Sequence, residues 1–299
     1  MARLRVSVEP GTAGRRVDQF LSQALPGLSV AGARRLLAAG AVRVDGRPAK
    51  KGERLGAGQV LEVDESAPAA ETPEGRRVQP EPTLPLQVLA VDDDFVAVAK
   101  PAGWPSHPLA AGERGTVANA LVARFPECAA ASPDPREGGL VQRLDTETSG
   151  ALLAARSADA WTRLRRALSD PACEKIYVAE VTGAAAAGGS SEPIGRVGRH
   201  GARVRVGAGR NPLPARTDWE LLEKRAATTL LRVRLGKGRA HQVRAHLAAA
   251  GHPIVGDAVY GTGGDAMHLH AWSVRFRHPR SGATISIEAP PPDWAKMRP

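Results

Sequence analysis

A proline-rich stretch divides this chain into two parts of unequal length. Residues 65–85 carry five prolines together with alanines and charged residues, and they show no apolar periodicity. A segment of this composition packs poorly into a core and is typical of a linker between domains. The sequence therefore predicts a small unit over residues 1–64, a linker over 65–85 and a larger unit over 86–299.

The chain is strongly basic. Its 41 Lys and Arg residues outnumber 31 Asp and Glu residues, which gives a formal net charge of +10. A positive surface of this size attracts polyanions, and nucleic acid is the commonest intracellular polyanion. The alternative is a protein whose arginine-rich faces are merely solvated.

The composition argues against several other classes of protein. Cys128 and Cys173 are too few for a disulfide framework and lack the partners of a metal site. No apolar run approaches the ~20 residues that a membrane span needs, and residues 1–9 lack the apolar stretch of a signal peptide. We therefore expect a cytoplasmic globular protein that makes no membrane contact.

The first 64 residues contain local signals for helices followed by strands. An apolar stripe from Val17 to Leu25 predicts a helix, and a second helix around residues 34–37 ends at Gly40. Residues 41–44 alternate like a strand and run into an Asp45-Gly46 turn, and residues 59–63 supply another strand. This part holds 11 Lys and Arg against 6 Asp and Glu, half of the chain's excess charge.

This pattern resembles a small RNA-binding module named after the S-four ribosomal protein. The matching residues are Arg16-Val17-Asp18-x-Phe20-Leu21, Leu28-Ser29 and Gly40-x-Val42-x-Val44-Asp45-Gly46. Val30 replaces the module's usual Arg, and Asp45 replaces its usual Asn. The resemblance implies phosphate contacts by basic residues of this unit, namely Arg16, Arg34, Arg35, Lys50 and Lys51. The alternative is a small helical domain with a solvated basic face.

The segment Gln142-Arg143-Leu144-Asp145-x-x-Thr148-Ser149-Gly150 carries one carboxylate among polar residues. It resembles the signature loop of the RluA-type pseudouridine synthases, His-Arg-Leu-Asp-x-x-Thr-Ser-Gly. The resemblance implies that Asp145 is the nucleophile. Gln142 stands where that family has a His, so this position cannot titrate. Taken alone, Asp145 could equally be a turn or cap carboxylate.

Two further segments extend the resemblance. Residues 174–181 alternate like a strand that places Lys175 and Tyr177 on one face. They are similar to the family's Lys-x-Tyr-x-Ala-x-Val strand, in which the Tyr stacks on the target base and takes part in proton transfer. The other segment is Gly238-Arg239-x-His241-Gln242-x-Arg244-x-His246, followed by Gly251-x-Pro253-x-x-Gly256-Asp257-x-x-Tyr260-Gly261. By this resemblance Arg244 pairs with Asp145, which keeps that carboxylate charged and oriented.

The segment Lys100-Pro101-Ala102-Gly103 resembles the family's Asn-Lys-Pro-x-Gly loop, with Ala99 in place of the Asn. Two interpretations stay open. Lys100 lies at the rim of an RNA cleft and binds RNA, or the loop is simply a stiff structural connection.

Histidine clustering suggests a competing metal site. Six of the eight histidines fall between His241 and His278, but His241 and His246 are five residues apart and do not align on a helix as ligands do. Gly236-Lys237-Gly238 is too short for a nucleotide-binding loop. We predict neither a metal nor a cofactor.

The resemblance implies an α+β fold, in which helices flank a mixed, mainly antiparallel sheet and a small N-terminal α/β RNA-binding module is appended. The expected reaction converts uridines in structured RNA to pseudouridine, with Asp145, Tyr177 and Arg244 as catalytic residues. The expected substrate contacts are Arg143, Thr148, Lys175, Arg239, His241 and Gln242. Large-subunit ribosomal RNA is the first expected target, transfer RNA the second, and the protein is expected to be a monomer. Two alternatives are an inactive RNA-binding assembly factor and a metal-dependent hydrolase.

Overall fold

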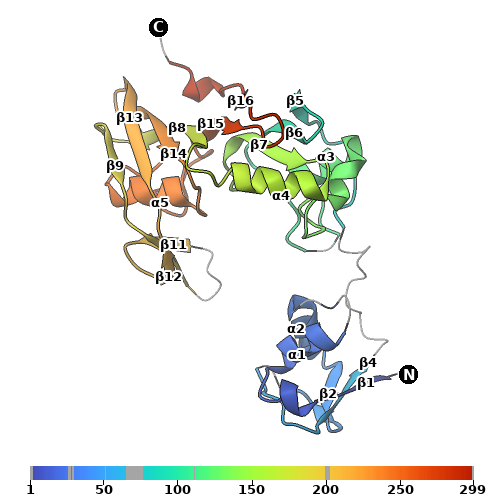
Figure 1. Ribbon diagram of the computed structural model, residues 1–299. Coiled ribbons are helices and arrows are strands. Elements are labelled where there is room, and N and C mark those ends of the chain that lie inside the picture. The colour runs from blue at the N-terminus through green and yellow to red at the C-terminus, as the bar shows by residue number, and fades with distance from the viewer. Residues whose placement is uncertain are drawn as a thin grey trace. The chain divides into compact units, whose positions relative to one another are not determined.

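The structure, a computed structural model, describes residues 3–25, 28, 30–50, 52–64, 77–110, 112–198 and 203–297. Contacts divide the chain into two compact units, residues 1–77 and residues 78–299 (Figure 1). Ser29 and Lys51, which the sequence assigns to the RNA-binding module, lie outside the described residues. None of the described helices combines the length and the apolar character needed to cross a bilayer.

The first unit packs two helices on one four-stranded antiparallel sheet, ordered β1-β4-β2-β3. Its elements are β1 (Arg3–Ser7), a 3-10 turn (Pro10–Thr12), α1 (Val17–Ala24), α2 (Val30–Ala38), β2 (Val42–Val44), β3 (Arg47–Pro48) and β4 (Val60–Asp64). The apolar stripe predicted for α1 is buried, since Val17 and Leu21 have no exposed surface. Asp45 and Gly46 both have positive φ, 49° and 78°, which closes the β2–β3 hairpin.

The second unit is built on a nine-stranded sheet (Figure 1). Its order is β5-β6-β7-β15-β8-β14-β13-β9, with β16 paired to β15. The strands of this sheet are β5 (Gln87–Val91), β6 (Phe95–Lys100), β7 (Ser149–Ala155), β8 (Glu174–Thr182), β9 (Gly188–Ser190), β13 (Thr217–Lys224), β14 (Thr228–Leu235), β15 (Leu269–Arg277) and β16 (Thr284–Glu288). Only the β7–β15 pair is parallel, which confirms the predicted mixed, mainly antiparallel sheet.

Helices cover both faces of this sheet. They are α3 (Val117–Arg124), α4 (Ala158–Ala167) and α5 (Gln242–Ala249). Alternate residues of β6 point to opposite faces, so Phe95 packs with the α4 side whereas Val96 packs with the α3 side. Helix α5 places Val243 and Leu247 against β8 and β14. The face of β8 that carries Tyr177 therefore lies next to α5.

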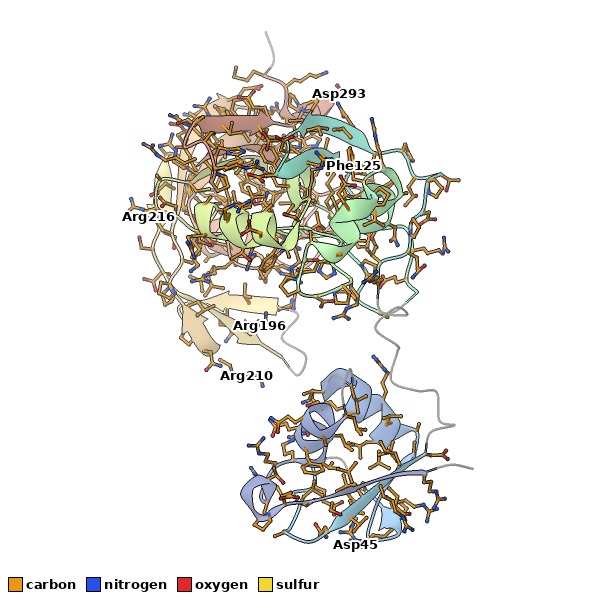
Figure 2. The ribbon with its side chains drawn as sticks, turned by 45° about the vertical axis from the view of Figure 1, so that its right-hand side comes forward. Asp45, Phe125, Arg196, Arg210, Arg216 and Asp293 are labelled. Atoms are coloured by element: carbon orange, nitrogen blue, oxygen red, sulfur yellow. The ribbon has the colours of Figure 1, made fainter. Side chains whose placement is uncertain are left out.

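A small three-stranded sheet stands apart from the main one, in the order β11-β10-β12. It consists of β10 (Ile194–Val197), β11 (Arg203–Val206) and β12 (Arg210–Leu213). Arg196 and Arg210 lie opposite each other on this sheet, and both are exposed (Figure 2). The sheet contacts the main unit beside α5, because Ala245 of that helix packs with Ile194 and Val204.

The boundary between the units differs from the one that composition predicts. Residues 65–76 lie outside the described residues, but Val78 is buried against α3 residues. Its backbone N–H donates to Pro135 O at 3.0 Å, and the backbone N–H of Glu81 donates to Asn119 O at 3.1 Å. The second half of the predicted linker is therefore part of the second unit, because these backbone groups find partners there.

Candidate active site

A cleft of about 890 Å³ in the second unit brings the predicted catalytic and substrate residues together. Three segments supply them: the loop before β7, the beginning of β8, and the turn that leads into α5. The predicted residues that line this cleft are Arg143, Asp145, Thr148, Lys175, Tyr177, Arg239, His241, Gln242 and Arg244. Segments nearly one hundred residues apart in sequence thus meet at one site: α5 packs on β8 and β14, and Arg244 of α5 contacts Asp145 of the loop before β7.

Asp145 and Arg244 form the predicted ion pair. Nη1 of Arg244 lies 2.9 Å from Oδ2 of Asp145. The other two guanidinium nitrogens, Nε and Nη2, donate to the two oxygens of Asp257, each at 2.8 Å. Asp257 is fully buried and also accepts the backbone N–H groups of Val259 and Tyr260. Asp257 therefore holds the guanidinium group of Arg244 in the orientation in which its Nη1 contacts Asp145.

Burial disfavours the cation of Arg244, but the hydrogen bonds and charges of Asp257 and Asp145 outweigh it and raise the pKa of Arg244. Arg244 therefore stays charged beside Asp145. Among the described residues no hydrogen bond reaches Oδ1 of Asp145, whose side chain is 26% exposed. This oxygen is open to the cleft and is available to a substrate atom.

Tyr177 lines the same cleft from β8. Burial, and to a smaller extent the charge of Asp145, raise the pKa of its phenol. Tyr177 is therefore a neutral ring at physiological pH. Such a ring offers an apolar face for a base to stack on, and it cannot act there as an anionic base. Burial also lowers the pKa of the neighbouring Lys175.

His241 has its proton position fixed by Tyr260. The backbone N–H of Val204 donates to Oη of Tyr260 at 2.9 Å, and that oxygen lies 3.1 Å from Nδ1 of His241. Within the part of the chain that is described, Nδ1 is the sole acceptor for the Tyr260 hydroxyl proton. Neutral His241 therefore carries its hydrogen on Nε2, which lies 3.9 Å from Oδ2 of Asp145. Burial lowers the pKa of His241, which favours this neutral form.

Lys100 does not lie where the sequence predicts. The side chain is 1% exposed, and its Nζ donates to the carbonyls of Pro101, Thr146 and Thr148 at 2.7–2.8 Å. The predicted RNA contact of Lys100 is therefore wrong, because all three N–H groups are used inside the protein. Instead the lysine anchors the loop that follows Asp145. Burial lowers its pKa to about 8.

Gln242 also requires a correction. It is 2% exposed, accepts the N–H of Arg239 and donates to Arg216 O and Thr217 Oγ1. Its side chain is thus occupied in shaping the turn before α5 and is not free to bind a substrate. Thr148 is equally buried, at 2% exposed. Arg143 and Arg239, by contrast, have guanidinium surface in the cleft.

Sequence reasoning missed two residues that hold the catalytic loop. Oγ of Ser106 donates to Leu144 O and accepts the N–H of Leu144, at 2.8 and 3.1 Å. The buried His107 places Nε2 3.4 Å from Nη1 of Arg143. Both residues follow the loop 100–105, and their position between prolines was the only local signal. No periodicity in that stretch predicts contact with residues 143–144.

In the basic module, the predicted phosphate contacts differ in their surroundings. Arg16 and Arg34 both bind the buried Asp18, at 3.0 and 2.7 Å, although their side chains are 37% and 55% exposed. Arg35 and Lys50 are exposed. Asp18 therefore fixes two guanidinium groups at the surface of this unit, where they can still face a phosphate.

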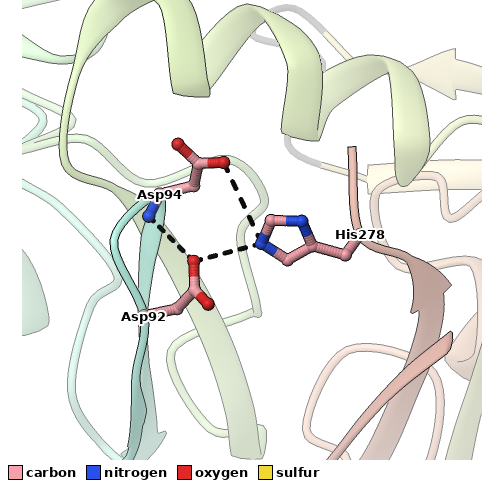
Figure 3. Close-up of side chains that lie close together, drawn as sticks. All are labelled: Asp92, Asp94 and His278. Carbon is pink, nitrogen blue, oxygen red and sulfur yellow. Dashed lines mark hydrogen bonds and ion pairs between the residues drawn. The ribbon is translucent and has the colours of Figure 1, made fainter. Parts of the chain in front are cut away.

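One group of potential metal ligands, Asp92, Asp94 and His278, occurs among the described residues (Figure 3). Nδ1 of His278 accepts the backbone N–H groups of Arg280 and Ser281, so Nε2 carries the proton and donates to Asp92 Oδ1 at 3.1 Å. The guanidinium of Arg280 binds both oxygens of Asp94. The ligand atoms are thus occupied by protons and by an arginine, and the group links the turn after β5 to the turn after β15.

Comparisons with known proteins agree with this geometry. The model of the RNA pseudouridylate synthase family matches residues 94–249, and that of the S4 domain matches residues 15–61. A ribosomal large subunit pseudouridine synthase D from Nitrosomonas europaea is 36% identical over 97% of this chain and 85% of its own length. An uncharacterized RNA pseudouridine synthase from Chloroflexus aurantiacus is 38% identical over 96% of this chain and 90% of its own.

The solved structure of human RNA pseudouridylate synthase domain containing 1 has a TM-score of 0.56 and 26% identity, over 71% of this chain and 86% of that one. The family match includes Asp145, Tyr177 and Arg244, which meet in the cleft described above. On these grounds the chain belongs to the RNA pseudouridylate synthase family and combines its catalytic domain with an S4 domain.

Proposed function

We propose that this enzyme converts uridines of large-subunit ribosomal RNA to pseudouridine, with Asp145 as the essential group. The observation that carries the proposal is the Asp145–Arg244 pair, which leaves one carboxylate oxygen open beside Tyr177 in the cleft. Ribosomal RNA is supported as the target by relatives named for the large ribosomal subunit, which span nearly the whole chain. The basic S4 domain agrees with a structured RNA.

The reaction breaks the bond between N1 of uracil and C1′ of ribose and forms a bond between C5 and C1′. The proton on C5 is released and N1 gains one, so no atoms are added or lost overall. The chemistry thus calls for no cofactor. Asp145 acts either as a nucleophile or as a base at the sugar, and both routes require a charged carboxylate.

The surrounding residues prepare that carboxylate and the base. Arg244 orients Asp145 through its Nη1 hydrogen bond, while its own Nε and Nη2 are held by Asp257. Tyr177 offers a neutral ring on which the uracil stacks, and His241 presents its Nε2–H toward the same space. Arg143, Lys175 and Arg239 contribute positive charge for the adjoining phosphates.

A uridine in structured RNA must be flipped out of its stack to reach Asp145, at a cost of a few kcal/mol. Phosphate contacts by Arg16, Arg34, Arg35 and Lys50 of the S4 domain help to offset this cost. We further propose that the enzyme acts as a monomer in the cytoplasm and accepts transfer RNA as a secondary substrate. No feature of the described residues favours the two alternatives, an inactive assembly factor and a metal-dependent hydrolase.

The target is tested by incubating the full chain with unmodified large-subunit ribosomal RNA and, separately, with unmodified transfer RNA. Chemical tagging of pseudouridine followed by primer extension then locates each product. The proposal expects discrete sites in ribosomal RNA and weaker or no modification of transfer RNA. Sites confined to transfer RNA would refute the proposed target while leaving the reaction intact.

A further inference from the structure

A second cavity, of about 450 Å³, lies in the catalytic unit apart from the substrate cleft. It is formed by the ends of β14 and β15 and the beginnings of β8, β13 and β16. Four arginines line it, and we call it the arginine groove: Arg216, Arg234, Arg275 and Arg277. Arg216 marks one edge of the unit in Figure 2.

Two of the four arginines in the arginine groove form ion pairs. Arg234 pairs with Glu174 at 2.7 Å, and Arg216 pairs with Asp218 at 2.9 Å. Arg275 and Arg277 are exposed and make no ion pair with any residue that the structure describes. Two guanidinium groups on one strand face thus form no ion pair within the described part of the chain, and four arginines share the groove with two carboxylates, those of Glu174 and Asp218. This excess of positive charge attracts an anion.

The arginine groove adjoins the substrate cleft. Leu235 lines both cavities, and the next residues along the chain, Gly236 and Lys237, line the groove and the cleft respectively. On β8, Glu174 lines the groove and the next residue, Lys175, lines the cleft. Alternate residues of a strand point to opposite faces of the sheet, so the two cavities lie on opposite faces, at the beginning of β8 and the end of β14. An RNA strand that passes round this end of the sheet, beside Gly236 and Lys237, reaches both cavities.

The lining indicates which part of a nucleic acid fits. Arg275 and Arg277 are two residues apart on β15, so their Cα atoms are about 7 Å apart on one face. The lining includes no Asn, Gln, His, Tyr or Trp, and Phe276 is buried. Aromatic rings on which bases could stack are thus missing from the exposed part of this lining, and its guanidinium groups suit bidentate contacts with phosphates.

We propose that the arginine groove binds phosphates of the RNA backbone that flanks the target uridine, without regard to sequence. This rests on the proposed function, since it extends the path of the same RNA. The groove gives the catalytic unit phosphate contacts of its own, in addition to those of the S4 domain. A long substrate then gains affinity that a short stem-loop, which fills only the cleft, does not.

The test is the full-length double variant Arg275→Glu/Arg277→Glu. Its matched control is Arg124→Glu/Arg166→Glu, which makes the same charge change at exposed arginines that line neither cavity. Affinity for a long ribosomal RNA fragment is measured at several salt concentrations, together with turnover of a short stem-loop. Thermal unfolding checks that both variants are folded.

For the groove variant, the plot of log affinity against log salt should become shallower by about 1.4–1.8, the release expected from two lost phosphate contacts. Stem-loop turnover should stay within about twofold of wild type. An unchanged slope, or an equal change in the control, would overturn the proposal, and an unchanged slope would point to an acidic protein as the occupant. If the wild-type protein modifies no RNA, the proposed function is wrong. The salt dependence of RNA affinity in the two variants still decides whether the groove binds phosphates.

Discussion

At the scale of single residues, Asp145 is positioned from two sides. Arg244 holds its carboxylate and is itself held by the buried Asp257. Lys100 holds the carbonyls of Thr146 and Thr148, which follow Asp145 in the loop. Geometry near a reacting group matters strongly, since a displacement of about 1 Å can cost about 100-fold in rate.

This arrangement predicts the effect of Lys100→Met, which keeps the length of the side chain but removes three hydrogen bonds. Turnover should fall about 100-fold because the loop loses its anchor, whereas RNA affinity should stay within about twofold. Steady-state kinetics and a binding titration separate the two effects. A large loss of affinity with normal turnover would instead restore an RNA-contact role. In wild type, turnover should decline as the pH rises through about 8, where Lys100 loses its proton.

Tyr260→Phe tests the proton position of His241. Without the hydroxyl, Nδ1 loses its donor, so both neutral tautomers of His241 become accessible. The expected loss of turnover is about tenfold, the value of one hydrogen bond. Nitrogen NMR of His241 should show a protonated Nε2 in wild type and mixed tautomers in the variant. A His241→Gln/Tyr260→Phe double variant should be no worse than His241→Gln alone, and additive losses would contradict the link.

The sequence supports these residues unequally. Asp145, Tyr177 and Arg244 stand in motifs that resemble those of the RluA-type family, and this resemblance predicts that they share one site. Lys100 was misjudged because a lysine between a strand and a proline is usually solvated. Only the tertiary contact with residues 146–148 buries it. The prediction for Gln242 is wrong because its partners Arg216 and Thr217, at the beginning of β13, are distant in sequence and only the fold brings them together.

At the scale of elements, local periodicity was a good guide to single helices and strands. The helix predicted from the apolar stripe of α1 and the strand predicted over residues 174–181, β8, are both present. The order of the nine strands was not accessible in this way. The parallel pairing of β7 with β15, at Ser149 and His270, joins segments that share no local signal.

Asp18 makes the S4 domain sensitive to acid. Hydrogen bonds from Arg16 and then Arg34 outweigh burial and lower the pKa of Asp18 from 3.8 to about 2. The stabilisation is therefore complete above pH about 4 and is lost as the pH falls through 2. Asp18→Asn should destabilise α1 and α2 by about 2 kcal/mol at pH 7, measured by hydrogen exchange in the full chain. An equal difference at pH 7 and pH 2 would contradict this origin.

At the scale of the whole molecule, a basic S4 domain and a catalytic domain with two positively lined cavities share one chain. The net charge of +10 is consistent with an extended anionic substrate. The chemistry itself, however, rests on one carboxylate, which is paired with one arginine. Asp145 is therefore the residue on which the proposed isomerisation depends most directly.

The most direct test is tritium release from large-subunit ribosomal RNA labelled at C5 of uracil, because the isomerisation expels that hydrogen. Wild type and Asp145→Asn are compared at equal RNA occupancy, which a binding titration establishes. Release by wild type, with none above background from Asp145→Asn although it still binds RNA, is the predicted result. Comparable release by the two proteins would contradict the assignment of Asp145 as the essential group.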